Sequence, residues 1–203
     1  MIYTAKAFPI EFVATFDLQF HPFQPETVET DYLEIGPGRG DFLVDMATAY
    51  PDKKFAAVEI GGKRFRKLSA RIDKAGLSNV LLIRGDARVV LPRLVPAGSV
   101  ARLFVLFPDP WPKRRHAHNR LLTPDFIRLL ADTIRPGGEL FHATDVQEYA
   151  EWVAENCRRV SGLTLGEPAI VADAPVVEYR PTYFEMKWRS EGKSIHYLLA
   201  RKE

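Results

Sequence analysis

The sequence predicts an α/β fold with a mostly parallel seven-stranded sheet and helices on both faces. From residue 31 onward, short apolar runs alternate with segments in which apolar residues recur at helical spacing. Glycine and proline separate many of these segments. A length of 203 residues with 46% apolar residues suits one domain with a substantial core. We therefore expect an N-terminal arm over residues 1–30 and a single domain over residues 31–203.

The first half of the domain is predicted to contain three strands and the helices that follow them. The strands are short apolar runs at residues 32–35, 55–60 and 80–83. Phe42 and Met46 begin the apolar face of the first helix, and Gly76 ends the second. Residues 87–95 are expected to form a short helix or a turn.

The second half is predicted to add four strands, at residues 100–107, 139–143, 163–171 and 194–201. Thr123 and Pro124 predict a helix start, because threonine caps a helix and proline favours its first position. That helix is expected to end before Pro136, and another to run from Asp145 to about residue 160. The segment 172–193 has little periodicity, and long loops inside a domain are often functional.

Charge and cysteine content exclude several classes of protein. The formal charge of +2 excludes a polycation, so nucleic-acid affinity would depend on local clusters such as residues 63–71 and 113–120. The single cysteine, Cys157, excludes an internal disulfide and a thiolate metal site and favours a reducing, cytoplasmic compartment. No apolar run approaches the ~18 residues that span a bilayer, and the N-terminus lacks a signal-peptide pattern. The arm is expected to pack on the domain or to cover a ligand as a lid.

The stretch LFVLFPDPWPKRRHAHNR, residues 103–120, organises the predicted site. An apolar strand ends in a proline-rich turn that contains Asp109 and Trp111, and a basic run follows. In open α/β sheets, ligands bind at the carboxyl ends of the strands. The stretch therefore predicts a carboxylate beside an aromatic ring, with cations placed for phosphates. His116 and His118 are too isolated for a metal site, and we expect none.

A glycine-rich turn follows the first predicted strand, with Gly36, Gly38 and Gly40 directly after Glu34. Such turns bring the backbone close to a ligand. The dinucleotide-binding pattern needs its third glycine at position 41, which is Asp41 here. A nearby carboxylate would also repel phosphate, so the turn favours a cationic or amino-bearing ligand.

Two further acids stand at the ends of the next strands. Glu59 can accept hydrogen bonds from ribose hydroxyls, and Asp86 can accept one from an exocyclic amine. Glu34 or Glu59 taken alone could equally be a capping or solvated residue. Together with Glu34 they form a row that matches a nucleoside carrying a positive centre and no phosphates.

These motifs resemble class I S-adenosylmethionine-dependent methyltransferases, and in particular the bacterial tRNA (guanine-N7-)-methyltransferase family. The resemblance covers roughly residues 31–200. It rests on Leu33-Glu-Ile-Gly-Pro-Gly-Arg-Gly40, Glu59, Asp86, Phe107-Pro-Asp-Pro-Trp-Pro-Lys113, Arg115-His116, Thr144-Asp145 and Thr182-Tyr-Phe-Glu185. It implies a Rossmann-like class I methyltransferase fold and transfer of a methyl group to N7 of a guanine in the variable loop of tRNA.

The resemblance also implies roles for individual residues. Asp109 would be the catalytic acid. S-adenosyl-L-methionine would be bound by Glu34, Gly36, Gly38, Gly40, Glu59, Asp86 and Asp109. The tRNA would be bound by Lys113, Asp145 and Thr182–Glu185, and its backbone by the stretch from Arg115 to Arg120. The implied partner is tRNA, with no DNA and no membrane, and the protein is expected to be a monomer or a homodimer.

The chain departs from the family pattern at Tyr183, where a lysine is usual, and at Ala117 and Asn119, where further cations are common. Two alternatives stay open. One is a methyltransferase that acts on an exocyclic amine of a nucleic-acid base; Trp111, where such enzymes have a second proline, counts against it. The other is an RNA-binding module without catalysis, which the acids at the successive strand ends disfavour.

Overall fold

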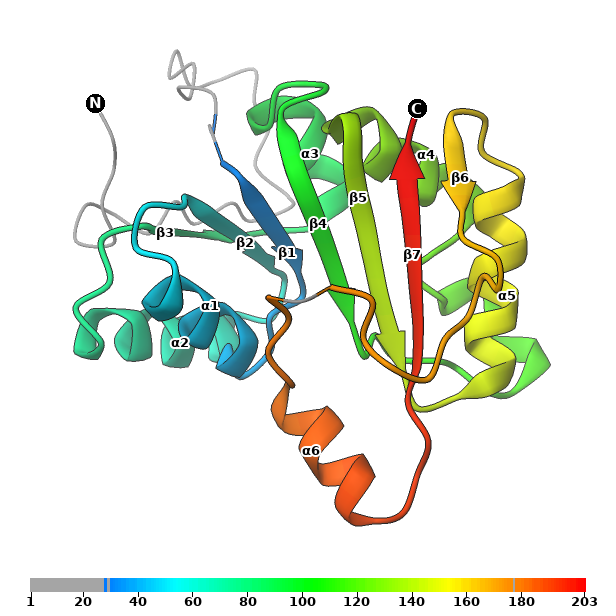
Figure 1. The fold of residues 1–203 in the computed structure, drawn as a ribbon. Coiled ribbons are helices and arrows are strands. Elements are labelled where there is room, and N and C mark those ends of the chain that lie inside the picture. Colours follow the sequence, from blue (N-terminus) through cyan, green and yellow to red (C-terminus); the bar gives the residue numbers. More distant parts are fainter. Residues whose placement is uncertain (1–27, 29, 177) are drawn as a thin grey trace.

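The computed structural model describes residues 28, 30–176 and 178–203. The predicted arm therefore lies outside the described residues, apart from Val28 and Thr30. Within the described chain, the strands form one seven-stranded sheet of order β3-β2-β1-β4-β5-β7-β6 (Figure 1). The strands are β1 (Tyr32–Ile35), β2 (Phe55–Glu59), β3 (Val80–Arg84), β4 (Val100–Leu106), β5 (Ile134–Thr144), β6 (Leu163–Leu165) and β7 (His196–Lys202).

Six α-helices and one 3-10 helix lie in the same described part of the chain. They are α1 (Asp41–Ala49), α2 (Gly62–Lys74), α3 (Ala87–Leu94), η1 (Arg114–Asn119), α4 (Pro124–Thr133), α5 (Gln147–Arg158) and α6 (Tyr183–Ser190). Thr123 caps α4 as predicted, because its hydroxyl accepts a hydrogen bond from the Phe126 N–H.

Strands β1 to β5 are parallel, and β7 pairs antiparallel with both β5 and β6. Two buried apolar clusters lie on the two faces of the sheet. One cluster joins α3, α4 and α5 to the sheet, and the other joins α1, α2 and the region around Tyr179 to it. The predicted mostly parallel seven-stranded sheet with helices on both faces is therefore confirmed.

The register of the sheet places several strand ends at one edge. Ile35 of β1 pairs with Val58 of β2 and Val105 of β4, and Val58 pairs with Ile83 of β3. Residues that directly follow these strands therefore share the carboxyl edge of the sheet. Figure 1 shows α6 beyond this edge, below the carboxyl ends of β4 and β5.

Apart from shifts of one or two residues at the ends of elements, three features differ from those predicted. β5 begins at Ile134, so it includes Pro136 and the glycines that were expected to precede it. β6 has three residues instead of nine, because Gly166 and Pro168 interrupt the ladder. The aperiodic segment 172–193 contains a helix, α6, that was not predicted. No helix in the described ranges has the length and apolar content to cross a membrane.

Candidate active site at the carboxyl edge of the sheet

The glycine-rich turn connects β1 directly to α1. Gly40 has a φ of 75°, and a Cβ there would lie 2.1 Å from Leu68 Cδ1 of α2. Glycine is therefore required where α1 and α2 approach each other. Gly36 also has a positive φ, of 70°, but a Cβ on it would meet no described atom within 4 Å. The turn leaves open space beside its first glycine.

Glu59, the last residue of β2, connects this turn to the second strand end. Its carboxylate accepts hydrogen bonds from the Gly61 N–H at 2.7 Å and the Gly38 N–H at 3.2 Å. The residue is only 2% exposed. Backbone donors therefore fix the orientation of this acid before any ligand binds.

Glu34 lies beneath the same turn and is 4% exposed. No described residue donates a hydrogen bond to its Oε2 atom. Burial raises the pKa of Glu34 to about 8, and the neighbouring charges of Glu59 and Asp41 add to this effect. A buried carboxyl group beside two other acids is a place where positive charge would be stabilised.

Asp86 follows β3 and caps α3. It accepts a hydrogen bond from the Arg88 N–H at 2.9 Å and forms an ion pair with the Arg88 side chain at 2.6 Å. The hydrogen bonds from Arg88 lower the pKa of Asp86, so the residue stays ionised. The sequence predicted that Asp86 can accept a hydrogen bond from an exocyclic amine; in the structure its carboxylate also accepts the hydrogen bonds of a helix cap.

Asp109 is exposed and lies in the turn that follows β4. Two non-glycine residues with positive φ, Phe107 at 50° and Trp111 at 41°, flank it. Such conformations are strained and persist where the surrounding structure holds them. The Phe107 N–H donates to the Ala143 carbonyl of β5 at 2.8 Å, which fixes the start of the turn.

The basic run divides into exposed and buried residues. Lys113 and Arg115 are exposed, at the start of η1. Arg120 is 8% exposed, and its guanidinium donates to the backbone carbonyls of Pro110 and Trp111. The prediction that Arg120 contacts phosphate disagrees with this position, because the guanidinium lies under the turn and not on its surface.

The predicted tRNA-binding acids already have partners in the structure. Asp145, after β5, forms an ion pair with Lys193 at 2.7 Å. Glu185 is 2% exposed and accepts hydrogen bonds from the hydroxyls of Tyr179 and Tyr197 and from Arg189. The Glu185 carboxylate, which was expected to bind tRNA, is therefore already bound by protein donors, and its contact with tRNA stays a prediction.

Thr182 is the N-terminal cap of α6, and its hydroxyl accepts a hydrogen bond from the Glu185 N–H at 3.0 Å. Next to it, Tyr183 packs against the glycine-rich turn: the Arg39 guanidinium lies 3.8 Å from the centre of its ring. The threonine and glutamate predicted to bind RNA thus build the start of a helix, and that helix lies against the turn that follows β1.

Comparisons with known proteins agree with this arrangement. The family model Methyltransf_4, "Putative methyltransferase", matches residues 29–198. A tRNA (guanine-N(7)-)-methyltransferase of Syntrophotalea carbinolica is 34% identical over 84% of this chain and 73% of its own length. One from Rhodospirillum rubrum is 39% identical over 88% and 70%. The chain belongs to the tRNA (guanine-N(7)-)-methyltransferase family.

Solved structures support the fold assigned to this family member. The 16S rRNA methyltransferase KamB matches with a TM-score of 0.63, 22% identity and 89% coverage of each chain. A SAM dependent methyltransferase from Aquifex aeolicus matches with a TM-score of 0.60 and 15% identity, over 88% of this chain and 85% of its own. At these identities the likeness concerns the fold alone, and it confirms the predicted class I methyltransferase fold.

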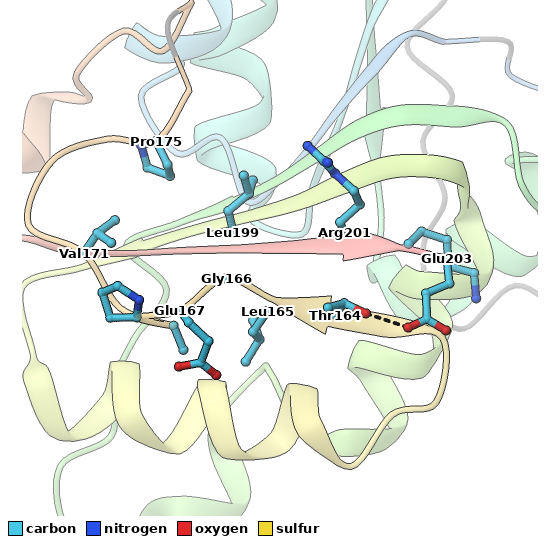
Figure 2. Close-up of a pocket in the computed structure, with 12 residues that line it drawn as sticks. Thr164, Leu165, Gly166, Glu167, Val171, Pro175, Leu199, Arg201 and Glu203 are labelled. Carbon is cyan, nitrogen blue, oxygen red and sulfur yellow. Dashed lines mark hydrogen bonds between the residues drawn. The ribbon is translucent and has the colours of Figure 1, made fainter.

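In this methyltransferase, the described structure brings Glu34, Glu59, Asp86 and Asp109 to one edge of the sheet, each at or just beyond a strand end. Tyr179 and Tyr197, which bind Glu185, were not predicted from the sequence, since they lie in or beyond the aperiodic segment. A pocket of about 600 Å³ lies elsewhere, between β6, β7 and residues 166–175 (Figure 2). None of the predicted site residues lines it.

Proposed function

We propose that this chain transfers a methyl group from S-adenosyl-L-methionine to N7 of a guanine in the variable loop of tRNA. The observation that carries the proposal is the buried Glu34 carboxyl, whose Oε2 atom lacks a described donor, beside the open glycine turn and Glu59. The proposal is also supported by the 34–39% sequence identity of this chain to tRNA (guanine-N(7)-)-methyltransferases. The substrate implies a cytoplasmic enzyme.

The acids fit S-adenosyl-L-methionine better than a phosphate-bearing cofactor. That molecule carries a sulfonium and an amino group, and the raised pKa of Glu34 marks a position where positive charge is favoured. Glu59 is fixed by two backbone donors and is suited to ribose hydroxyls. Asp86 has the lone pairs to accept an adenine amine in addition to its helix cap.

Bound S-adenosyl-L-methionine supplies an electrophilic methyl group, which the N7 lone pair of guanine takes while the electron pair of the broken bond stays on sulfur. N7 carries an in-plane lone pair, so this chain needs no base to deprotonate it. The purine becomes positively charged, and the exposed carboxylate of Asp109 is placed to stabilise that charge. Catalysis by the chain then consists of positioning and electrostatics.

Exposed cations next to this turn suit an RNA backbone. Lys113 and Arg115 are both exposed and follow Asp109 by only a few residues. Phosphate contacts would position the RNA without reading its sequence. Beyond the same edge, α6 exposes Phe184, whose ring can stack on an unpaired base.

Methyl transfer to bulk tRNA and to duplex DNA, with radiolabelled S-adenosyl-L-methionine, tests the proposal. The expected product after nucleoside digestion and mass spectrometry is 7-methylguanosine from tRNA alone. Replacing Asp109 with Ala should lower the turnover by about 100-fold or more, because one electrostatic contact at a reacting centre is lost. Methylation of an exocyclic amine would contradict the proposal, and so would cofactor binding without transfer.

A further inference from the structure

Arg120 is placed beneath the Asp109 turn by two hydrogen bonds to consecutive backbone carbonyls. Its Nε atom donates to the Pro110 oxygen at 3.0 Å, and Nη2 donates to the Trp111 oxygen at 3.4 Å. Proline has no N–H and a fixed φ, so the turn has few bonds of its own. The guanidinium therefore supplies a connection that the turn cannot make internally.

Side chains of α5 also contact the Arg120 guanidinium and stabilise its charge. Its guanidinium carbon lies 5.1 Å from the ring centre of Trp152 and 5.6 Å from that of Tyr149. The carboxylate of Glu148 is 3.8 Å away. Aromatic faces and one acid thus stabilise a cation that is only 8% exposed. To reach a phosphate, this side chain would have to leave all of these partners.

The turn that Arg120 supports carries strain next to the proposed catalytic acid. Trp111, whose carbonyl accepts from Arg120, has a φ of 41°. Asp109 directly precedes Pro110, the other residue that Arg120 contacts. Because proline restricts the residue before it, a change in the position of Pro110 also moves the backbone of Asp109.

We infer that Arg120 is a positioning residue: it holds the Asp109–Trp111 turn in its strained conformation and does not bind tRNA phosphates. Its partners Tyr149 and Trp152 serve the same purpose by holding the guanidinium in place. This role rests on the proposed function insofar as Asp109 is taken as the acid at the reacting centre. The position of the turn itself can be measured without any activity.

The first measurement is fluorine NMR of protein labelled with 5-fluorotryptophan. The chain has three tryptophans, and the Trp111→Phe variant assigns the signal of Trp111. We expect this signal to shift or broaden in Arg120→Lys and Arg120→Ala, because lysine cannot donate to two carbonyls in a fixed fork. The control Arg158→Lys changes an exposed arginine on α5 and should leave the signal as in the wild type.

The second measurement separates turnover from tRNA affinity. Both Arg120 variants should lose roughly 10- to 100-fold in kcat, as expected for a displaced catalytic group, with the dissociation constant for tRNA changed less than about twofold. The salt dependence of tRNA binding should stay that of the wild type. If Arg120→Ala does not fold, Arg120→Lys carries both measurements, because it keeps the charge and most of the volume.

Two results would overturn the inference. One is a Trp111 signal unchanged from the wild type in both Arg120 variants. The other is a log–log salt slope lowered by about one unit in Arg120→Ala and restored in Arg120→Lys, which is the behaviour of a phosphate contact. If the wild-type protein methylates no tRNA, the proposed function fails, whereas the Trp111 signal still decides the role of Arg120.

Discussion

The Glu34 carboxyl is buried beside two other acids, Glu59 and Asp41, and this environment raises its pKa. Its raised pKa, about 8, means that the folded protein holds a proton which the unfolded chain releases near pH 4.5. The stability contributed by this protonation is complete below pH 4.5 and is lost as the pH rises to about 8. Glu34→Gln should therefore stabilise the cofactor-free protein at pH 8 by on the order of 1–4 kcal/mol, with little effect at pH 4.5.

Urea unfolding of the cofactor-free protein between pH 4.5 and pH 9 measures this effect. Asp132→Asn, which neutralises an exposed acid on α4, is the matched control and should follow the wild type at every pH. A difference between Glu34→Gln and the wild type that does not change with pH would contradict the assigned environment of Glu34.

The Glu59→Ala variant tests the proposed binding of S-adenosyl-L-methionine. Glu59→Ala should weaken binding of S-adenosyl-L-methionine, because each hydrogen bond to a charged group contributes roughly 1.5–3 kcal/mol. Calorimetric titration measures this affinity directly, and the affinity for tRNA alone should stay near the wild-type value. If the cofactor binds Glu59→Ala as tightly as the wild type, Glu59 only organises the Gly38 and Gly61 backbone.

For single residues, the sequence predicts where the acids lie, but it does not predict which arginines are buried. Glu34, Glu59 and Asp109 are placed by the strands they end or follow, so their common edge can be derived from the order of elements. Arg115 and Arg120 look alike within one basic run. Only the packing of α5 decides that the second is buried, and no local pattern encodes that contact.

Besides the 3-10 helix η1, helix α6 is an element that was not predicted from the sequence. Its apolar side chains Tyr183, Phe184 and Met186 are exposed, so it lacks the apolar face that marks a packed helix. The signal present was its cap, since Thr182 followed three residues later by Glu185 is a capping-box pattern. In the structure the glutamate binds Tyr179 and Tyr197 instead of the cap backbone.

We expect Glu185→Gln to destabilise the protein by about 1–3 kcal/mol, because an amide offers one acceptor where the carboxylate serves two tyrosines and an arginine. Thr182→Ala should cost about 1 kcal/mol through the lost cap. Urea denaturation measures both. Met186→Ala changes an exposed residue of the same helix and should stay within about 0.5 kcal/mol of the wild type.

A Glu185→Gln variant with wild-type stability and reduced turnover would contradict this structural role. It would instead favour the base contact expected from the sequence. The free energy of unfolding of Glu185→Gln is lowered if Glu185 has the structural role and unchanged if it does not, so urea denaturation distinguishes the two roles.

For the whole molecule, the alternation of strand and helix patterns predicts the fold class, because parallel strands need crossover helices on both faces. The antiparallel insertion of β7 between β5 and β6 is not encoded in any local pattern, because it depends on which two strands the last strand pairs with. The early end of β6 follows from Gly166 and Pro168, residues that a search for apolar runs overlooks.

The formal charge of the whole chain is only +2, so its overall charge contributes little attraction to tRNA. The affinity for tRNA then depends on few phosphate contacts, and each contact adds about one unit to the slope of log affinity against log salt concentration. Arg115→Ala should lower the log–log slope by about one unit and weaken binding to all tRNAs alike. Filter binding from low to moderate salt checks this, and an unchanged slope would exclude Arg115 from the interface.

Methyl transfer to a tRNA transcript made with 7-deazaguanosine tests whether N7 of guanine is the atom that accepts the methyl group. This nucleoside keeps the exocyclic amine and the base-pairing edge of guanosine but has carbon in place of N7. We expect methyl transfer to the ordinary transcript and none to the 7-deaza transcript, which should still bind and compete. Equal methylation of the two transcripts would show that the methyl group goes to another atom and would contradict the assignment of N7.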